Sequence, residues 1–276
     1  MPRGSVALPD AGVYVLSSSR GTPGEVFCLC DAGPLGFLSI AAHGHADALS
    51  FTLSVGGQPL IVDAGTYVYH ADRAWRDYFR GTPAHNTITI DGVDQSQSGG
   101  IFLWTRKAIT QVLDWKPGEA GGRLVAQHDG YTRLPGRPLH RRSFDLTDRR
   151  LEIADEIDGR GTHDIEWRLH FHPDCTVSLN AGRCLVEWQG GRMELALDTK
   201  LQWRIESGGT RAGWFSPGFN VKLPCPTLIG KTKASLPFRC AVTAVIHSSD
   251  DRQGIHGGEG FGREGRSLSL RFYRQA

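Results

Sequence analysis

Apolar and polar residues alternate with a period of two along most of this 276-residue chain, and this alternation limits the possible folds more than any other feature. Clear examples are Val26–Cys30, Ser50–Val55, Leu151–Ile157, Asp164–Phe171 and Leu268–Phe272. Because successive side chains of a strand point to opposite faces, the pattern predicts strands with one buried face. Short strands that recur roughly every 8–12 residues are typical of β-sandwiches.

Turn-forming residues separate these segments. The chain holds 35 Gly and 14 Pro, more than average, and they follow no collagen-like period. Gly56-Gly57 lies between two apolar runs and predicts a β-hairpin, whereas Ala71–Arg80 is the one segment with a persuasive helical pattern. We therefore predict an all-β chain with at most one or two short helices. It is expected to form one domain over residues 1–276, with a boundary between sheet layers near 118–122.

Composition argues against several classes of protein. The net charge of +2 indicates no nucleic-acid partner. No apolar stretch approaches the ~18 residues of a membrane span, and the first residues lack the apolar core of a signal peptide. The six cysteines are scattered, so we expect buried thiols rather than a disulfide framework. Cys28 and Cys30 share one face of a predicted strand, an arrangement that does not favour their pairing.

Candidate functional residues gather between positions 37 and 95, several of them at the ends of predicted strands. His43 and His45 point to the same face of an extended segment, about 7 Å apart. Asp63 closes an apolar strand, and His85 lies where a loop enters the next strand. If these strand ends converge, two imidazoles and a carboxylate from His45, Asp63 and His85 suit Zn²⁺ with a fourth position open.

Each of these residues also has a structural interpretation. The His-x-His pair is compatible with surface or hydrogen-bonded histidines, and Asp63 with a turn-forming carboxylate that caps backbone N–H groups. The segment Trp75–Arg80 either stacks on a sugar ring and binds an anion through Arg80, or simply packs against its neighbours. From spacing alone, both interpretations stay open.

Three blocks of the sequence resemble the C-terminal β-sandwich region of the heparinase II/III family of polysaccharide lyases. The blocks are His43–Asp47, Ile61–Tyr67 and Phe79–Thr87, and their order and spacing match that family. Trp214–Phe219 is similar to a later segment of the same region, less specifically. The resemblance extends over nearly the whole chain.

This resemblance implies a multilayer antiparallel β-sandwich, a jelly-roll-like supersandwich, which the family packs against an N-terminal α/α toroid. Family members cleave uronic-acid polysaccharides by β-elimination in the cleft between the two parts. The resemblance also implies a mainly structural zinc ion bound by His45, Asp63 and His85, with His43 facing the cleft as the proton-transferring base. Tyr67 matches a position near the substrate, and we group it with Arg80 as a substrate-binding candidate.

The sequence departs from the family in one large respect, because no segment of it matches the helical toroid. The tyrosine that acts as the acid and the Asn or His that neutralises the substrate carboxylate are missing with it. We expect a fragment or a split gene product that meets a toroid in cis or in trans, and an isolated chain without lyase activity. The family suggests a periplasmic or extracellular location and an acidic, uronate-containing polysaccharide as partner, without identifying the polysaccharide.

Two other functions remain open at this point. A cupin-like metal-dependent oxygenase or isomerase also combines a β-fold with a His-x-His pair and a later histidine. The Glu expected after that pair is absent here, and only Asp47 is nearby. The other alternative is a non-catalytic sandwich that binds an acidic glycan through Tyr67, Trp75, Tyr78 and Arg80.

Polar residues beyond this region are assigned to the scaffold. We expect His170 and His172 to be surface or hydrogen-bonded residues of one strand face. Arg137–Arg150 is rich in arginine but interleaved with aspartates, which indicates a solvated strand pair rather than an anion site. His128 and His140 have no partner pattern in the sequence.

Overall fold

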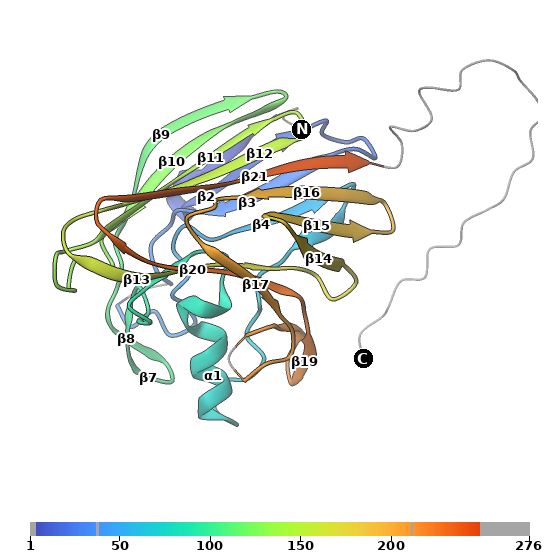
Figure 1. Ribbon diagram of the computed structural model, residues 1–276. Helices are drawn as coiled ribbons and strands as arrows, with labels where there is room; N and C mark the ends of the chain where they lie inside the picture. The colour runs from blue at the N-terminus through green and yellow to red at the C-terminus, as the bar shows by residue number, and fades with distance from the viewer. Residues whose placement is uncertain (1–3, 37–38, 211, 249–276) are drawn as a thin grey trace, which may run out of the picture.

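The computed structural model describes residues 4–36, 39–210 and 212–248, which form antiparallel sheets and one α-helix (Figure 1). The predicted all-β class is confirmed. Side chains alternate between buried and exposed positions as the period-two pattern requires, for example along β12 (Arg150–Asp158). The predicted strand Leu268–Phe272 lies outside the described residues.

Three sheets contain most of the strands. The first has five strands in the order β1 (Val6–Leu8), β2 (Val13–Ser18), β3 (Val26–Asp31), β4 (Phe51–Val55) and β5 (Gln58–Ile61). The second has eight, in the order β14 (Thr176–Asn180), β15 (Arg183–Trp188), β16 (Gly191–Leu197), β21 (Phe238–Ser248), β12, β11 (Leu139–Thr147), β10 (Gly121–His128) and β9 (Thr110–Gly118). The third has four, in the order β17 (Gln202–Glu206), β20 (Thr227–Ser235), β13 (Thr162–His170) and β6 (Ile88–Ile90).

Smaller elements gather at one end of the sandwich, where α1 (Arg73–Arg80) lies between two hairpins (Figure 1). The hairpins are β7 (Gln97–Gly100) with β8 (Leu103–Arg106), and β18 (Trp214–Gly218) with β19 (Val221–Pro224). Two 3₁₀ turns, η1 (Pro9–Ala11) and η2 (Thr82–Ala84), complete the described elements. The loops that enter this end carry the candidate site.

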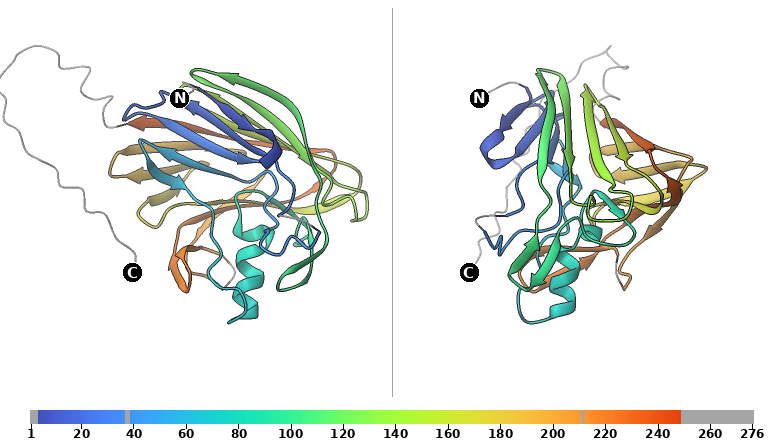
Figure 2. Two further views of the ribbon diagram at one scale, coloured as in Figure 1. Left: turned by 180° about the vertical axis from the view of Figure 1, so that it is seen from behind. Right: turned by 90° about the vertical axis from the view of Figure 1, so that its left-hand side faces the viewer.

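The hydrophobic core lies between the three sheets. Phe51 of the first sheet, Phe144 of the second and Trp167 of the third are each at most 2% exposed and belong to one cluster of buried side chains. The rings of Phe51 and Phe144 meet edge to face with centroids 5.5 Å apart. Each such side chain stabilises the fold by about 1.5–3 kcal/mol. Figure 2 shows the blue strands of the first sheet as a layer beside the eight-stranded sheet.

Local sequence signals account for the hairpin and the helix. Gly56 and Gly57 have φ values of 55° and 78°, which glycine adopts without strain, and they join β4 to β5 as predicted. The helix α1 begins where the Asp72 carboxylate accepts hydrogen bonds from the backbone N–H groups of Ala74 and Trp75. Both predictions are therefore confirmed, the helix starting two residues later than expected.

The predicted boundary between sheet layers near 118–122 is wrong. Gly118 ends β9 and Gly121 begins β10, and the two glycines face each other across a hairpin inside the eight-stranded sheet. Gly121 has a φ of 131°, and a Cβ there would lie 2.0 Å from the Leu146 carbonyl oxygen. The glycines of segment 118–122 therefore serve a tight turn within one sheet, not a passage between two sheets.

The predicted solvated pair at Arg137–Arg150 is correct in part. The segment does form the antiparallel strands β11 and the start of β12. Arg141 is half-exposed and pairs with Glu156, but Arg142, on the opposite face of β11, is fully buried.

No helix among the described residues is long and apolar enough to cross a membrane.

Candidate metal centre and active site

His45, Asp63 and His85 come together at the strand ends. His45 lies in the loop between β3 and β4, Asp63 follows β5, and His85 lies between η2 and β6. One potential ligand atom from each side chain lies within 4.8 Å of those of the other two. Within residues 4–36, 39–210 and 212–248, no other group of His, Cys, Asp or Glu side chains converges in this way.

Backbone geometry fixes Asp63 in this position. Its Oδ1 accepts a hydrogen bond from the Gly65 N–H at 2.9 Å, a short turn that orients the carboxylate. Its Oδ2 lies 2.6 Å from Nδ1 of His85. Gly65 has a φ of 80°, and a Cβ there would lie 2.4 Å from the Ser216 carbonyl oxygen, so only glycine fits between Asp63 and β18.

The protonation states follow from burial and mutual contact. Burial, aided by neighbouring His85, lowers the pKa of His45 to about 3 and keeps its imidazole neutral. Burial opposes the charged form of His85, but the Asp63 carboxylate outweighs it and raises the pKa of His85 to about 9. Burial also disfavours ionised Asp63, yet His85 outweighs this and holds the Asp63 pKa well below its ordinary value.

This donor set fits a zinc ion. Neutral imidazole and ionised carboxylate are the ligand forms of His and Asp. The His85 ring is completely buried, and its Nε2 has no hydrogen-bond partner among the described residues. His85 and Asp63 form an ion pair, so holding a metal through His85 would require the loss of an imidazole proton.

Arg76 of α1 supports the loop that carries both histidines of the His-x-His pair. Its guanidinium lies 3.4 Å from Nε2 of His45, donates to the Ala42 carbonyl oxygen at 3.3 Å and to that of Ile101 at 3.4 Å. It also lies over the Tyr69 ring, 5.0 Å from the centroid. Sequence analysis missed this residue, although it shares the buried face of α1 with Phe79 three positions later.

His43 lies beside this cluster but on the surface. Its imidazole meets the Tyr69 ring edge to face at 5.4 Å and lies 6.2 Å from the Phe102 ring. Tyr69 and Phe102 in turn stack at 5.8 Å. His43 is therefore held by aromatic contacts while one side of its ring stays accessible to a ligand.

The two predicted substrate-binding residues have different surroundings. Tyr67 is half-buried, with a φ of 60°, and its ring contacts Phe79 at 5.5 Å. Arg80 is only 1% exposed, donates to the carbonyl oxygen of Ile101 at 2.8 Å and lies over the Trp104 ring at 4.0 Å. The expected anion contact of Arg80 is therefore corrected, because its guanidinium holds a loop instead of facing solvent.

Asn86 is a second residue that sequence analysis missed. Its Nδ2 donates to the carbonyl oxygens of Phe51 and Val62 at 2.8 and 2.9 Å, and its Oδ1 accepts from the His170 N–H at 2.7 Å. It therefore connects the segment after His85 to the residue before Asp63. Asparagine is depleted in strands, so an Asn just before the apolar strand β6 was the available signal.

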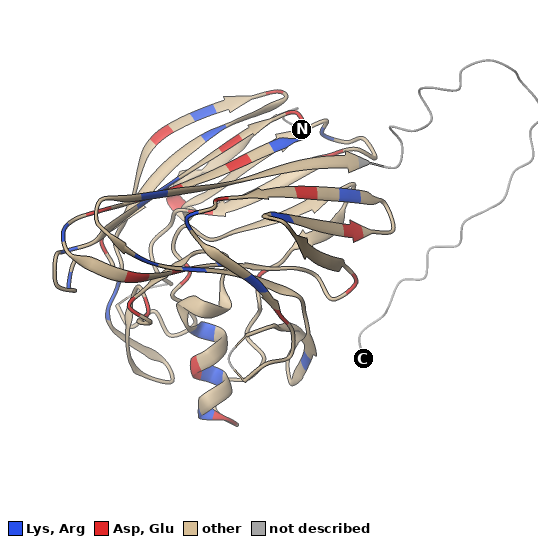
Figure 3. Ribbon diagram, in the orientation of Figure 1, with Lys and Arg blue, Asp and Glu red and all other residues tan. Residues whose placement is uncertain are grey.

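A large groove lies away from this cluster. It has a volume of about 1570 Å³ and runs between α1 and the strands β13 and β20. Its charged lining is mixed, with Asp77, Asp94 and Glu166 facing Arg168 and Lys231. It includes none of the three converging residues, and Figure 3 shows positive and negative residues interspersed over the sheets. Size alone therefore does not locate the chemistry.

Comparisons with known proteins show the family of the chain. The family described as heparinase II/III-like, C-terminal, matches residues 1–252. The chain is 27% identical over 166 residues to a heparin-sulfate lyase of Bacteroides stercoris, a match covering 58% of this chain and 22% of that protein. It is 33% identical over 90 residues to a heparin-sulfate lyase of Pedobacter heparinus, covering 32% of this chain and 13% of that protein.

Solved structures give the same fold. A heparan sulfate lyase from Pedobacter heparinus superimposes with a TM-score of 0.73 at 19% identity, covering 89% of this chain and 37% of that chain. A crystal structure of heparinase III gives a TM-score of 0.70 at 18% identity, covering 87% of this chain and 36% of that chain. This chain thus spans little more than a third of these structures. It belongs to the heparinase II/III-like C-terminal domain family.

Proposed function

We propose that this chain is the C-terminal domain of a polysaccharide lyase that cleaves uronic-acid-containing glycans by β-elimination. The observation that carries the proposal is the convergence of His45, Asp63 and His85 within 4.8 Å, beside the accessible His43 on the same loop. The relatives named as heparin-sulfate lyases support an acidic polysaccharide as the substrate class. Family membership also favours this reaction over the cupin-like alternative.

The proposed metal role is mainly structural. His45, Asp63 and His85 would hold a zinc ion, which supplies a fixed positive charge that ties three separate loops together. The residues themselves come from the β3–β4 loop, the segment after β5 and the segment between η2 and β6.

His43 is the proposed base. In β-elimination a base removes the proton at C5 of the uronate, the C4–O bond breaks and a C4–C5 double bond forms. An acid then protonates the departing glycosidic oxygen. Imidazole is the side chain most often used for such transfers near neutral pH. The contacts of His43 with Tyr69 and Phe102 restrict its ring orientation.

The acid is proposed to come from an α/α toroid, joined in cis or in trans. Two facts support a missing partner: the chain spans about a third of the similar solved structures, and large apolar side chains near His43 are exposed. Phe102 is 41% and Phe219 59% exposed. We therefore expect no turnover from the isolated chain.

The test compares the chain alone with the chain supplied with a helical domain of the same family. Product formation is followed by the ultraviolet absorbance of the unsaturated uronate. We expect turnover of a uronate polymer only in the combined sample, and its loss with His43→Ala. Equal turnover by His43→Ala would overturn the role of His43. Glycan binding without cleavage in either sample would favour the non-catalytic binding domain.

A further inference from the structure

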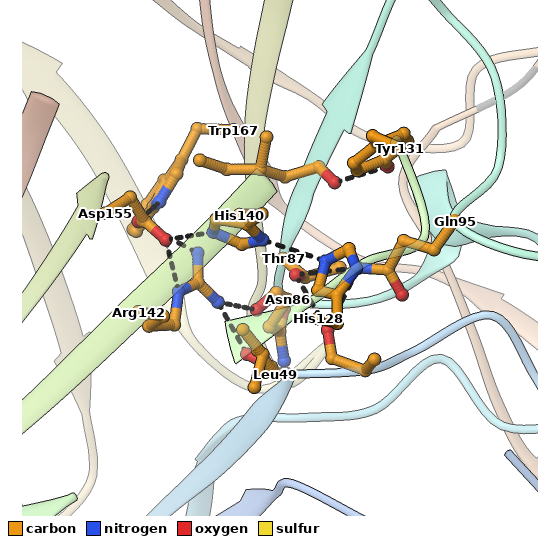
Figure 4. Close-up of polar contacts among 12 residues, drawn as sticks. Leu49, Asn86, Thr87, Gln95, His128, Tyr131, His140, Arg142, Asp155 and Trp167 are labelled. Carbon is orange, nitrogen blue, oxygen red and sulfur yellow. Dashed lines mark hydrogen bonds and ion pairs between the residues drawn. The ribbon is translucent and has the colours of Figure 1, made fainter. Parts of the chain in front are cut away.

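A second polar cluster lies inside the sandwich (Figure 4). Its anion is Asp155 of β12, which is 2% exposed. Asp155 accepts hydrogen bonds from Nε and Nη2 of Arg142 at 2.7 and 3.0 Å, from Nε1 of Trp167 at 2.7 Å and from Nε2 of His140 at 2.6 Å. Every side chain in this contact is buried.

The hydrogen bonds define a consistent set of protons. The Gly130 N–H donates to Nδ1 of His128 at 3.1 Å, so Nε2 of His128 carries the proton donated to Nδ1 of His140 at 3.0 Å. His140 in turn donates through Nε2 to Asp155. Both imidazoles are neutral in this assignment. The only charges in the chain of contacts are Arg142 and Asp155, and they form a bidentate pair.

The other end of Arg142 faces the candidate site. Its Nη1 donates to the Leu49 carbonyl oxygen at 2.8 Å and to the Asn86 carbonyl oxygen at 2.7 Å. Asn86 directly follows His85, and Leu49 lies on the loop that carries His45. Leu49 has a φ of 60°, a left-handed conformation that persists only when surrounding contacts hold it.

The Asn86 side chain carries the connection to the third ligand candidate. It donates to the carbonyl oxygen of Val62, the residue before Asp63. Arg142 and Asn86 therefore contact the backbone of all three segments that carry the converging side chains. Through these hydrogen bonds the eight-stranded sheet, which contains Arg142, is connected to the three segments that carry His45, Asp63 and His85.

Energetics favour a positioning role for these contacts. A buried ion pair costs several kcal/mol of desolvation per ion, and apolar residues of similar volume often give equal or greater stability. Arg142 nevertheless uses four hydrogen bonds to fixed acceptors on two sides. Its planar fork suits this task, whereas the single ammonium of lysine cannot reproduce it.

We propose that the Asp155–Arg142–Asn86 network is a positioning device that holds the backbone of the three loops so that His45, Asp63 and His85 converge on one ligand. This inference rests on the proposed function, because the cluster it positions is the proposed metal site. Arg142 and Asn86 are positioning residues and do not touch the ligand. Networks that orient metal ligands typically change affinity by 10–100-fold when mutated.

The experiment measures zinc affinity of the purified chain by competition with a chromophoric chelator, with circular dichroism as the check of folding. We expect Arg142→Met to weaken zinc binding by up to about 100-fold and Arg142→Lys by about 10-fold. The matched control is Arg141→Met, the neighbouring residue on the opposite, half-exposed face of β11, which should bind zinc like the wild type. If Arg142→Met does not fold, Arg142→Lys decides the result.

A second readout does not depend on metal. Hydrogen–deuterium exchange of the metal-free chain reports the order of segments 45–51 and 84–88. In Arg142→Lys, amide hydrogens of these two segments should exchange faster than in the wild type. The exchange rates in β14 to β16 should be unchanged. Unaltered exchange together with unaltered zinc affinity in folded Arg142→Lys would overturn the positioning role. A wild-type chain that binds no zinc would overturn the proposed metal site, and exchange alone would then decide the inference.

Discussion

Two groups of two histidines and one aspartate lie among the described residues, and their surroundings differ. In the first, His45, Asp63 and His85 converge from three strand ends. In the second, the buried cluster, His140 lies between His128 and Asp155, and each ring nitrogen already has a hydrogen-bond partner. Composition is therefore a poor guide to function. Convergence with an unpartnered ring nitrogen, as at His85, indicates a ligand site, whereas complete internal pairing indicates scaffold.

The largest expected effect is on the buried cluster. Asp155→Ala leaves the Arg142 guanidinium buried without its carboxylate, and we expect a loss of about 3–5 kcal/mol in the free energy of unfolding. Urea denaturation measures it. Glu156→Ala is the matched control, because Glu156 pairs with Arg141 and Arg239 near the surface and should cost about 0–1 kcal/mol. Similar losses of stability for both variants would contradict the expected difference between the buried face of β12, with Asp155, and its partly exposed face, with Glu156.

Metal removal should act on the first group alone. At a zinc concentration about 100 times the Kd, binding stabilises the fold by about 2.7 kcal/mol. We expect this stabilisation to vanish with His85→Ala and with a chelator, as measured by thermal denaturation with and without zinc. His247→Ala, a control at a side chain that is 43% exposed, should retain it. An undiminished zinc effect in His85→Ala would place the metal elsewhere.

Acid should destabilise the fold through its buried neutral histidines, including the two of the buried cluster. Burial lowers the pKa of both His128 and His140, so below about pH 6.5 the unfolded chain binds protons that the folded chain does not. The free energy of unfolding should therefore fall as the pH drops from about 6.5, by about 1.4 kcal/mol per pH unit for each histidine.

Urea titrations of the chelator-treated chain at several pH values measure this slope. In His128→Gln one titrating group is gone, and the slope should be shallower by about 1.4 kcal/mol per pH unit. A slope identical to that of the wild type would show that His128 is not the neutral, buried group inferred from its hydrogen bonds.

The smallest effect is expected at His43. This side chain is exposed, so His43→Ala should change the free energy of unfolding by no more than about 0.5 kcal/mol. Zinc affinity should also be unchanged, because His43 is not among the converging residues. Denaturation and chelator competition check both expectations. A large loss of stability or of zinc affinity in His43→Ala would indicate that His43 takes part in the metal centre.

The fold was largely predictable from local pattern, whereas the converging residues were not. Period-two alternation specifies strands because it acts on every residue, and Gly56-Gly57 specifies its turn by backbone freedom alone. The first group was predicted because the three sequence blocks resemble a known family in order and spacing. Spacing of 18 and 22 residues between His45, Asp63 and His85 would not have been enough by itself.

Long-range pairing accounts for the residues that sequence analysis missed or misplaced. Arg142 is buried because Asp155, Leu49 and Asn86 surround it, and Leu49 and Asn86 lie 93 and 56 positions away in the sequence. Alternation along β11 indicates that Arg141 and Arg142 face opposite ways, but not which face is buried. The same holds for Arg80, whose partners at 100–103 lie some twenty residues away.

X-ray absorption at the zinc edge, recorded on the zinc-loaded chain and on His85→Ala, tests the central claim most directly. The wild type should give one zinc per chain with two imidazole nitrogens and a carboxylate oxygen at about 2.0–2.2 Å. The variant should lose the imidazole signal of one ligand or the metal altogether. Zinc bound without imidazole, or an identical spectrum for both proteins, would contradict the account.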